Sequence, residues 1–172
     1  MNVAELIAAF DEKVDKAVDG LRSPAMDGVV YRLSSAADHG LLWQAFGVAR
    51  ALRHGGDLGA AGRFAAAMGI ESALTNGPVK ALFNRVRPFD YEAIVFPHGL
   101  RRPVTSSFPS GHATAGFCAA TLLGGGPWYA AAAAVAATRV YVRLHHASDV
   151  VAGAALGVVL GCAMRPFVNR GE

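Results

Sequence analysis

The sequence predicts an all-α fold, a membrane-embedded bundle of about five to six helices with an N-terminal amphipathic helix. Hydrophobic residues make up 53% of the chain and charged residues only 17%, whereas about a quarter of the residues in soluble domains are charged. Residues 103–138 and 150–164 contain no Asp, Glu, Lys or Arg. This composition argues against a disordered chain, a nucleic-acid-binding tail or a disulfide scaffold.

We expect a single domain over residues 1–172, with lead-in helices over 1–38, because no repeat or low-complexity linker divides the chain. The first segment is amphipathic and would lie on a membrane surface or against the bundle. A second amphipathic stretch covers residues 26–37. The apolar positions of the first segment recur at helical spacing: Val3, Leu6, Ile7, Phe10, Val14 and Val18.

The bundle itself is expected over residues 41–166, with helices at 41–52, 58–83, 110–123, 128–144 and 148–164. As a helix, the uncharged residues 150–164 span about 22 Å, less than the roughly 30 Å of a hydrocarbon core. Either the helices extend through their polar ends or the bilayer thins locally. A water-soluble bundle with very apolar core helices is the alternative. Gly153, Gly157 and Gly161 share one helix face, as in close helix packing within lipid.

The first polar cluster ends the helix predicted over 58–83. Lys80 and Arg87 are seven residues apart, nearly two helical turns, so a continuing helix would present both cations on one face; Pro88 follows. By itself, such a basic helix end also fits side chains that snorkel to lipid headgroups.

The second cluster, residues 107–112, opens an uncharged helix. Pro109 suits a helix start, where free N–H groups and the helix dipole favour an anion. Gly111 leaves room for that anion, Ser110 can donate a hydrogen bond, and His112 adds a titratable proton. A simple helix cap with an incidental histidine explains this cluster equally well.

The third cluster contains Arg139, His145 and Asp149. Asp149 can accept a hydrogen bond from one imidazole nitrogen of His145, which leaves the other nitrogen as a nucleophile. Metal binding by His145, His146 and Asp149 is the rival interpretation. Nearby arginines would repel a divalent cation, and the chain has no paired Cys or Cys/His metal spacing. We therefore expect no metal and no cofactor.

Together, the three clusters resemble the signature of the type 2 phosphatidic acid phosphatase superfamily in order and spacing. The pattern is Lys-x6-Arg-Pro, then Pro-Ser-Gly-His, then Ser-Arg-x5-His-x3-Asp, and the resemblance covers residues 41–164. Thr138 stands where the pattern has Ser, and it keeps the hydroxyl. The small membrane-bound lipid phosphatases of this superfamily are the most similar members.

The resemblance implies catalytic roles for His145, His112 and Asp149. His145 would take the phosphoryl group as a phosphohistidine, Asp149 would fix its tautomer, and His112 would be the general acid. The phosphoryl oxygens would be held by the remaining motif residues, which are Lys80, Arg87, Ser110, Gly111 and Arg139. If the resemblance is right, the His145 ring lies within about 10 Å of the guanidinium groups of Arg87 and Arg139.

Several residues near the motifs are not part of the signature. Arg143 is expected to bind a headgroup or form a structural salt bridge, and His146 to take no part. Arg101 and Arg102 precede the second motif and could contact a second phosphate or a sugar. Trp43 and Trp128 are expected to be anchors at the membrane interface.

The resemblance implies an enzyme whose partners are the bilayer and a lipid phosphate. By analogy with small bacterial members, the substrate would be a polyprenyl (di)phosphate or a polyprenyl-linked phosphosugar of cell-wall synthesis. Phosphatidic acid and phosphatidylglycerol phosphate are alternatives, and a non-catalytic phospholipid-binding or transport protein is the alternative from another class. The pI of 9.1 hints at nucleic acid, but the charges do not form one stripe.

The expected location is the cell membrane, crossed several times. The motifs share one membrane face, and basic residues of the connection near 50–63 and of the tail lie at the other. The positive-inside rule makes that other face cytoplasmic and places the active site outside the cytoplasm. Four basic residues of the lead-in weaken this inference: Lys13, Lys16, Arg22 and Arg32.

Overall fold

The computed structural model describes residues 1–53, 57–88 and 105–170, and within these ranges all regular structure is helical. This confirms the predicted all-α class. A 3₁₀ turn, Asp38–Gly40, precedes α3, and a π turn, Thr75–Val79, follows α4. The α-helices are α1 (Val3–Asp19), α2 (Pro24–Ala36), α3 (Leu41–Arg53), α4 (Leu58–Leu74), α5 (Gly111–Leu122), α6 (Pro127–Tyr141) and α7 (Ala147–Val168).

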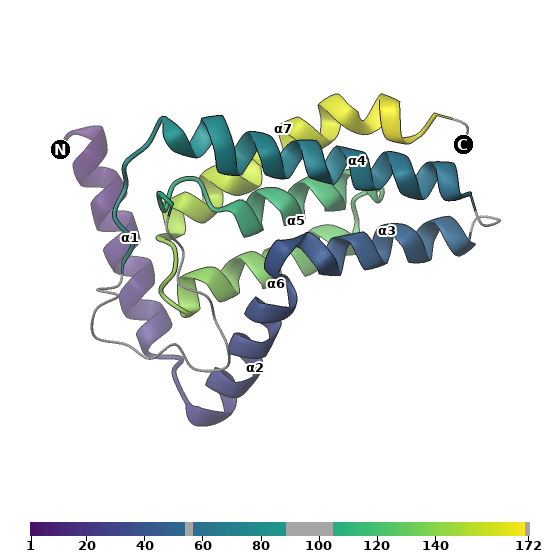
Figure 1. Cartoon of the computed structure of the whole chain (residues 1–172). Coiled ribbons are helices and arrows are strands. Elements are labelled where there is room, and N and C mark those ends of the chain that lie inside the picture. Colours follow the sequence, from purple (N-terminus) through teal and green to yellow (C-terminus); the bar gives the residue numbers. More distant parts are fainter. Residues whose placement is uncertain (54–56, 89–104, 171–172) are drawn as a thin grey trace.

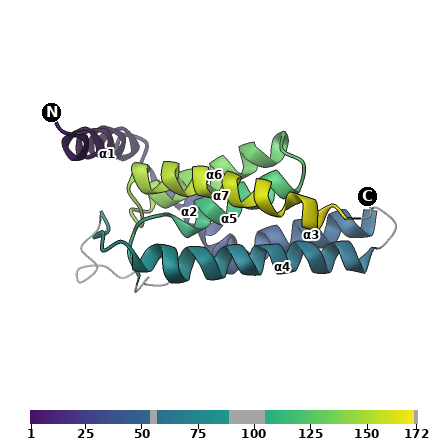
Figure 2. The same cartoon turned by 90° about the horizontal axis from the view of Figure 1, so that it is seen from above.

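The helices α3 to α7 run along a common direction and form the bundle, with α5 in contact with α3, α4, α6 and α7 (Figures 1 and 2). Helix α1 lies beyond one end of this bundle in both views, where it contacts α6 and α7. The core is built from Ala, aromatic and aliphatic residues of α3 to α7. Trp43 is fully buried in it, 6.1 Å from Phe46 between ring centroids, so the expected membrane-interface anchor at Trp43 is wrong.

Close packing of α5 on α7 depends on the glycine stripe. Gly153, Gly157 and Gly161 are all buried. A Cβ atom on Gly153 would lie 2.6 Å from the backbone oxygen of Ser110, and one on Gly157 would collide with the backbone of Thr114. The stripe therefore lets the two backbones approach closely, as predicted, and it fixes α7 against the start of α5.

Helix α7 is long and apolar enough to cross a membrane, with 22 residues and a mean hydropathy of 1.8. Its rise is about 33 Å, which exceeds the roughly 30 Å of a hydrocarbon core. Helix α7 thus continues beyond the uncharged residues 150–164 at both ends. Among the helices described, no other meets the same length and hydropathy limits.

The helix predicted over 58–83 is interrupted, although helical structure resumes at residues 80–81. Regular α-helix stops at Leu74 and passes into the π turn, where Gly77 has non-helical dihedral angles and Pro78 removes a backbone donor. Residues 83–87 are not helical. The expectation that Lys80 and Arg87 share a helix face is therefore wrong, and Arg87 reaches the same site from an extended segment.

Helix α1 is held to the bundle by a buried acid. The Asp11 carboxylate accepts hydrogen bonds from the backbone and hydroxyl of Ser148, both at 2.8 Å, and from Arg85 at 2.6 Å. The apolar face of α1 stays outside this contact: Val3, Leu6, Ile7 and Phe10 are exposed. Further along α1, Val18 packs against the buried cluster of Tyr141, Val142 and Leu144, so the contact with the bundle combines polar and apolar groups.

Candidate active site

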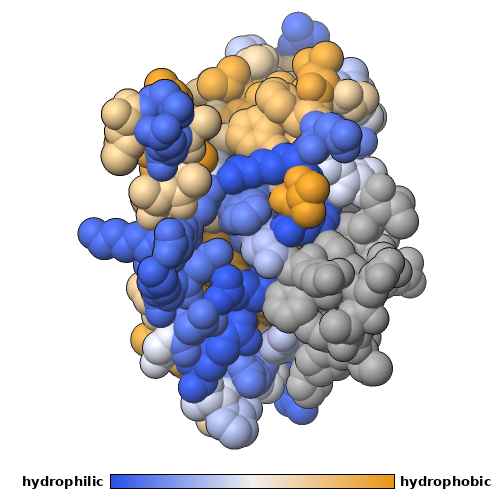
Figure 3. Space-filling model, turned by 90° about the vertical axis from the view of Figure 1, so that its left-hand side faces the viewer, coloured by the Kyte–Doolittle hydropathy of each residue, from blue (hydrophilic) through white to orange (hydrophobic). Residues whose placement is uncertain are grey.

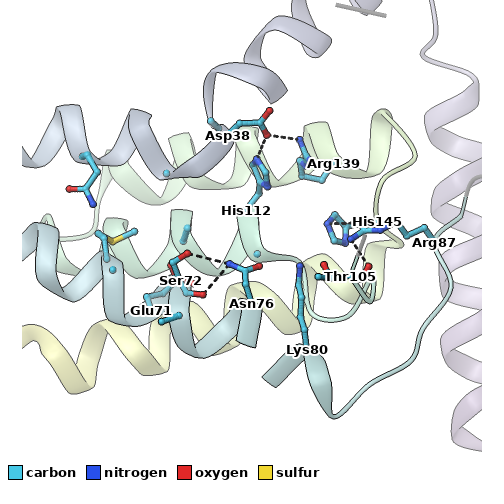
Figure 4. Close-up of a pocket in the computed structure, with 18 residues that line it drawn as sticks. Asp38, Glu71, Ser72, Asn76, Lys80, Arg87, Thr105, His112, Arg139 and His145 are labelled. Carbon is cyan, nitrogen blue, oxygen red and sulfur yellow. Dashed lines mark hydrogen bonds and ion pairs between the residues drawn. The ribbon is translucent and has the colours of Figure 1, made fainter. Parts of the chain in front are cut away.

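The three clusters meet in one cavity of about 680 Å³ at the end of the bundle nearest α1 (Figure 4). Hydrophilic residues cover much of this end of the molecule (Figure 3). The lining residues come from the turn before α3, from α3 and α4, from the segments after α4 and before α5, from α5 and α6, and from the turn before α7. Of the predicted site residues, it is lined by Lys80, Arg87, Gly111, His112, Arg139 and His145.

His145 stands in a tight turn between α6 and α7. Arg143 has a positive φ of 59°, and the His145 backbone N–H donates to the Arg139 carbonyl at 3.1 Å, which turns the ring inward. Its Nε2 is 3.2 Å from Arg87 Nη1. Because a guanidinium can only donate, Nε2 carries the lone pair and the proton of the neutral ring is on Nδ1. Burial, aided by the nearby arginines, lowers the pKa of His145 to about 3, so the ring is neutral at physiological pH.

Asp149 is placed to orient that ring. Its Oδ2 is 3.7 Å from His145 Nδ1, an ion-pair distance longer than a hydrogen bond. The carboxylate is fixed by Arg85, which donates to Oδ1 at 2.6 Å, and by the backbone N–H of His146, which donates to Oδ2 at 2.9 Å. Sequence reasoning missed Arg85, although its place inside the Lys-x6-Arg segment was a signal.

Arg87 is positioned by backbone carbonyls. Nη1 donates to the Leu144 carbonyl at 2.6 Å, and Nη2 donates to those of Thr105 and Ser106 at 3.1 and 3.2 Å. The segments before α5 and before α7 are thus tied to the same guanidinium. This explains how a residue in an extended segment comes to lie beside His145.

The start of α5 faces Lys80. A Cβ atom on Gly111 would lie 3.0 Å from Asn76 Oδ1 and 3.7 Å from Lys80 Nζ, so glycine keeps the space before the helix N-terminus open. Ser110 is the helix N-cap and accepts from the Ala113 backbone at 3.5 Å. It is fully buried and does not line the cavity, so its contact with phosphate stays a prediction.

Asp38 is a site residue that the sequence did not reveal. On the turn between α2 and α3, its Oδ1 is 2.9 Å from His112 Nε2 and 3.8 Å from Arg139 Nη1 (Figure 4). Arg139 Nη1 also donates to the Ser34 hydroxyl at 2.5 Å. The lead-in thus supplies part of the cavity wall, and no motif spacing indicated this.

The residues near the motifs that are not part of the signature have different surroundings. Arg143 forms ion pairs with Asp15 at 3.0 Å and Asp19 at 2.5 Å, both on α1, so it is the expected structural salt bridge. His146 does not line the cavity. Arg101 and Arg102 lie outside the described residues.

A family model for the PAP2 superfamily matches residues 60–171, well over half of the chain. The chain belongs to the PAP2 superfamily. This confirms the resemblance stated from the three motifs, and the matched range contains every motif residue that lines the cavity. As a PAP2 protein, the chain is a phosphatase, and a lipid phosphate in a membrane is consistent with its family.

A solved structure shows the same fold. It is the crystal structure of a transmembrane PAP2-type phosphatidylglycerolphosphate phosphatase from Bacillus subtilis, with a TM-score of 0.73 and 22% sequence identity over 97% of this chain and 88% of that one. The likeness extends to the lead-in helices, which the family model does not cover. No curated protein matches the chain.

We expect phosphate to bind less tightly to the PAP2 cavity at alkaline pH. Burial, together with Arg87 and Arg139, lowers the pKa of Lys80 to about 8. Below that pH the ammonium is charged and attracts phosphate, and above it the charge is lost. We expect the inhibition constant of inorganic phosphate to rise as pH passes 8.

Lys80→Arg is the matched variant, since its guanidinium keeps its charge. In this variant we expect the rise near pH 8 to disappear. An unchanged profile would assign the alkaline limit to another group.

Proposed function

We propose that this chain removes phosphate from a membrane lipid through a phosphohistidine on His145. The proposed substrate class is a polyprenyl (di)phosphate or a polyprenyl-linked phosphosugar of cell-wall synthesis, with phosphatidic acid and phosphatidylglycerol phosphate as the alternatives. The observation that carries the proposal is the His145 Nε2 lone pair, which lies in one cavity with Lys80, Arg87 and Arg139. A nucleophile among three cations is suited to a phosphate ester.

The first step transfers the phosphoryl group. Nε2 of His145 forms a bond to phosphorus as the bond from phosphorus to the lipid oxygen breaks, and that oxygen takes a proton from His112. Asp149 stabilises the positive ring through Nδ1–H. In the second step, His112 takes a proton from water, the resulting oxygen attacks phosphorus, and the P–N bond breaks. Inorganic phosphate leaves, and both histidines return to their starting forms.

Charge that develops on the phosphoryl oxygens is met by cations already in place. Lys80, Arg87 and Arg139 line the cavity, and the N-terminus of α5 opens onto it at Gly111. Preorganised donors of this kind stabilise the transition state without reorganisation. The proposed chemistry uses the positive charge of these side chains where other phosphatases use a metal.

Asp38 supports the acid in this scheme. A general acid must carry a proton, yet burial first, and then the nearby Arg139 and Lys80, lower the pKa of His112 and disfavour a positive ring. The Asp38 carboxylate, 2.9 Å from Nε2, stabilises the protonated ring and sets its orientation. We assign Asp38 as a positioning residue for His112.

The proposed enzyme crosses the membrane several times, with its active site on the extracytoplasmic face. The motifs lie at one end of the bundle, and Arg50, Arg53, Arg63 and Arg165 lie towards the other end, on α3, α4 and α7. By the positive-inside rule, the arginine end is cytoplasmic. A tag-accessibility map that places the connection near 50–63 outside the cell would overturn this orientation.

Phosphate release from a panel of lipid phosphates in detergent, with EDTA present, tests the function. We expect release that EDTA does not affect and that vanadate blocks. The panel compares polyprenyl diphosphate, a polyprenyl-linked phosphosugar, phosphatidic acid and phosphatidylglycerol phosphate. If the protein binds these lipids but releases no phosphate from any of them, the non-catalytic alternative is correct.

A further inference from the structure

One arginine joins helix α1 to the histidine and aspartate of the active site. Arg85 Nη2 donates to the Asp11 carboxylate on α1, and Arg85 Nη1 donates to Oδ1 of Asp149, both at 2.6 Å. The Asp149 side chain is fully buried, and that of Asp11 is 6% exposed. Hydrogen bonds between charged groups are the stronger ones in proteins. Asp11, Arg85 and Asp149, which we call the α1 network, thus form a continuous connection from α1 to the neighbour of His145.

The surrounding backbone holds the network in place. The Arg85 N–H donates to the Ser106 hydroxyl at 3.2 Å, and the Arg85 carbonyl accepts from the Ser107 N–H at 3.1 Å. Asp11 Oδ1 accepts from the backbone N–H of Ser148, in the first turn of α7, at 2.8 Å. A carboxylate is favoured there, because the first N–H groups of a helix have no partner within it. Asp11 is therefore fixed relative to the start of α7.

Arg85 and Asp11 lie outside the cavity that is proposed to hold phosphate. Among the described residues, the lining of the 680 Å³ cavity includes neither of them. Both instead line a separate cleft of about 440 Å³, which also includes other residues of α1. The Arg85 guanidinium donates to two carboxylates and, at 2.7 Å, to the Ser148 hydroxyl. Arg85 is thus placed to act on Asp149 and not on the substrate.

The net charge of the α1 network has the sign that the proposed reaction needs. Transfer of a phosphoryl group to His145 leaves a positive ring, in a cavity whose other cations disfavour that charge. Arg85 by itself would cancel the negative charge of Asp149. With Asp11 on its other side, the network consists of two carboxylates and one guanidinium, a net charge of −1. Asp11 therefore preserves the negative charge that Asp149 presents to the ring.

We propose that Asp11 is a positioning residue that acts through Arg85 on Asp149 and His145, so that α1 takes part in the reaction. This rests on the proposed phosphatase function, and it gives a role to a helix that lies outside the residues matched by the family model. Without Asp11, Arg85 pairs with Asp149 alone. The Asp149 carboxylate, now 3.7 Å from His145 Nδ1, is then neutralised by Arg85 and stabilises the phosphorylated ring less.

The first test compares Asp11→Asn with the wild-type protein. The variant removes the charge, and its amide oxygen can still accept from the Ser148 N–H, so the contact with α7 is kept. On the lipid of the panel that the wild-type protein hydrolyses fastest, we expect kcat to fall by about 10- to 100-fold, the size of one charge-assisted hydrogen bond. The inhibition constant of inorganic phosphate should not rise, because the cations of the cavity are unchanged. A rise in this constant together with the loss of kcat would indicate a merely structural role and overturn the inference.

Asp15→Asn is the matched control. Asp15 lies one helical turn further along α1 and pairs with Arg143 at 3.0 Å, and Arg143 keeps its pair with Asp19 in this variant. The change removes the same charge from the same helix but leaves the α1 network intact, so we expect kcat to stay close to the wild-type value. Equal losses in Asp11→Asn and Asp15→Asn would overturn the inference, because the attachment of α1 would then explain both.

Arg85→Gln tests whether Asp11 acts through the arginine. We expect kcat to fall in this variant, since Asp149 Oδ1 loses its donor, and the inhibition constant of phosphate not to rise. Asp11→Asn should cost little more in the Arg85→Gln background. Losses that multiply in the double variant would contradict the inference, as would weaker phosphate binding in Arg85→Gln. If the wild-type protein releases no phosphate from any lipid of the panel, the phosphatase function itself is wrong, whereas full activity of Asp11→Asn would remove this inference alone.

Discussion

His145→Ala is expected to abolish lipid phosphate hydrolysis, with kcat reduced by about 10⁴-fold or more. The reason is that His145 Nε2 is the proposed bond-forming atom, so the variant lacks the nucleophile. Steady-state phosphate release measures the loss. A rapid quench with phosphate-labelled substrate should trap label on the wild-type protein and none on the variant.

His146→Ala is the control for this variant. It removes the adjacent imidazole, which does not line the cavity, and it keeps the backbone N–H that holds Asp149. We expect it to retain most of the activity. If His145→Ala remains active, or if label stays on the protein without His145, the assigned nucleophile is wrong.

His112→Ala is expected to slow phosphoryl transfer from an alkyl phosphate by about 10²–10⁴-fold, the usual contribution of a general acid. With p-nitrophenyl phosphate the effect should be small, because nitrophenolate leaves without a proton. The burst of nitrophenol release isolates this first step from the later attack by water. The difference between the two substrates is a signature of acid catalysis that damage to the fold would not produce.

In Asp38→Asn we expect a smaller loss of rate than in His112→Ala, and again a larger loss with an alkyl phosphate than with p-nitrophenyl phosphate. The variant leaves His112 in place but removes the carboxylate oxygen that lies 2.9 Å from its Nε2. In the double variant with His112→Ala, Asp38→Asn should add little, since its proposed role acts through that ring. Equal losses for both substrates would contradict the positioning role. Additive losses in the double variant would show that Asp38 acts through another group, such as Arg139, whose Nη1 lies 3.8 Å from Asp38 Oδ1.

The predictions from the sequence were accurate where they depended on residue patterns within one segment. Charge-free stretches and helical spacing predicted the all-α class, and the glycine interval of four predicted the face on which α7 packs. The motifs predicted that Lys80, Arg87 and His145 lie together, and these residues do line one cavity. This holds although the backbone at Arg87 is not the predicted helix, because the motif spacing reflects the chemistry and not one backbone path.

The predictions from the sequence were less accurate for features that depend on the tertiary path of the chain. The interruption of the helix predicted over 58–83 was not foreseen, because the π turn at Gly77 and Pro78 still carries apolar residues. Trp43 was assigned to the interface because aromatic residues favour both interfaces and cores, and only the packing partners decide between them.

By itself, the sequence determined which residues are proposed to carry the chemistry: the histidines, cations and glycine of three short segments, each with a fixed internal spacing. Only the tertiary structure decided what surrounds them. It brought Asp38 to His112 over 74 residues, and Asp11 and Arg85 to the start of α7. These contacts form between side chains on separate helices, so they depend on how the helices cross. A periodic pattern shows which face of a helix is buried, but it does not show which residue on another helix that face will meet.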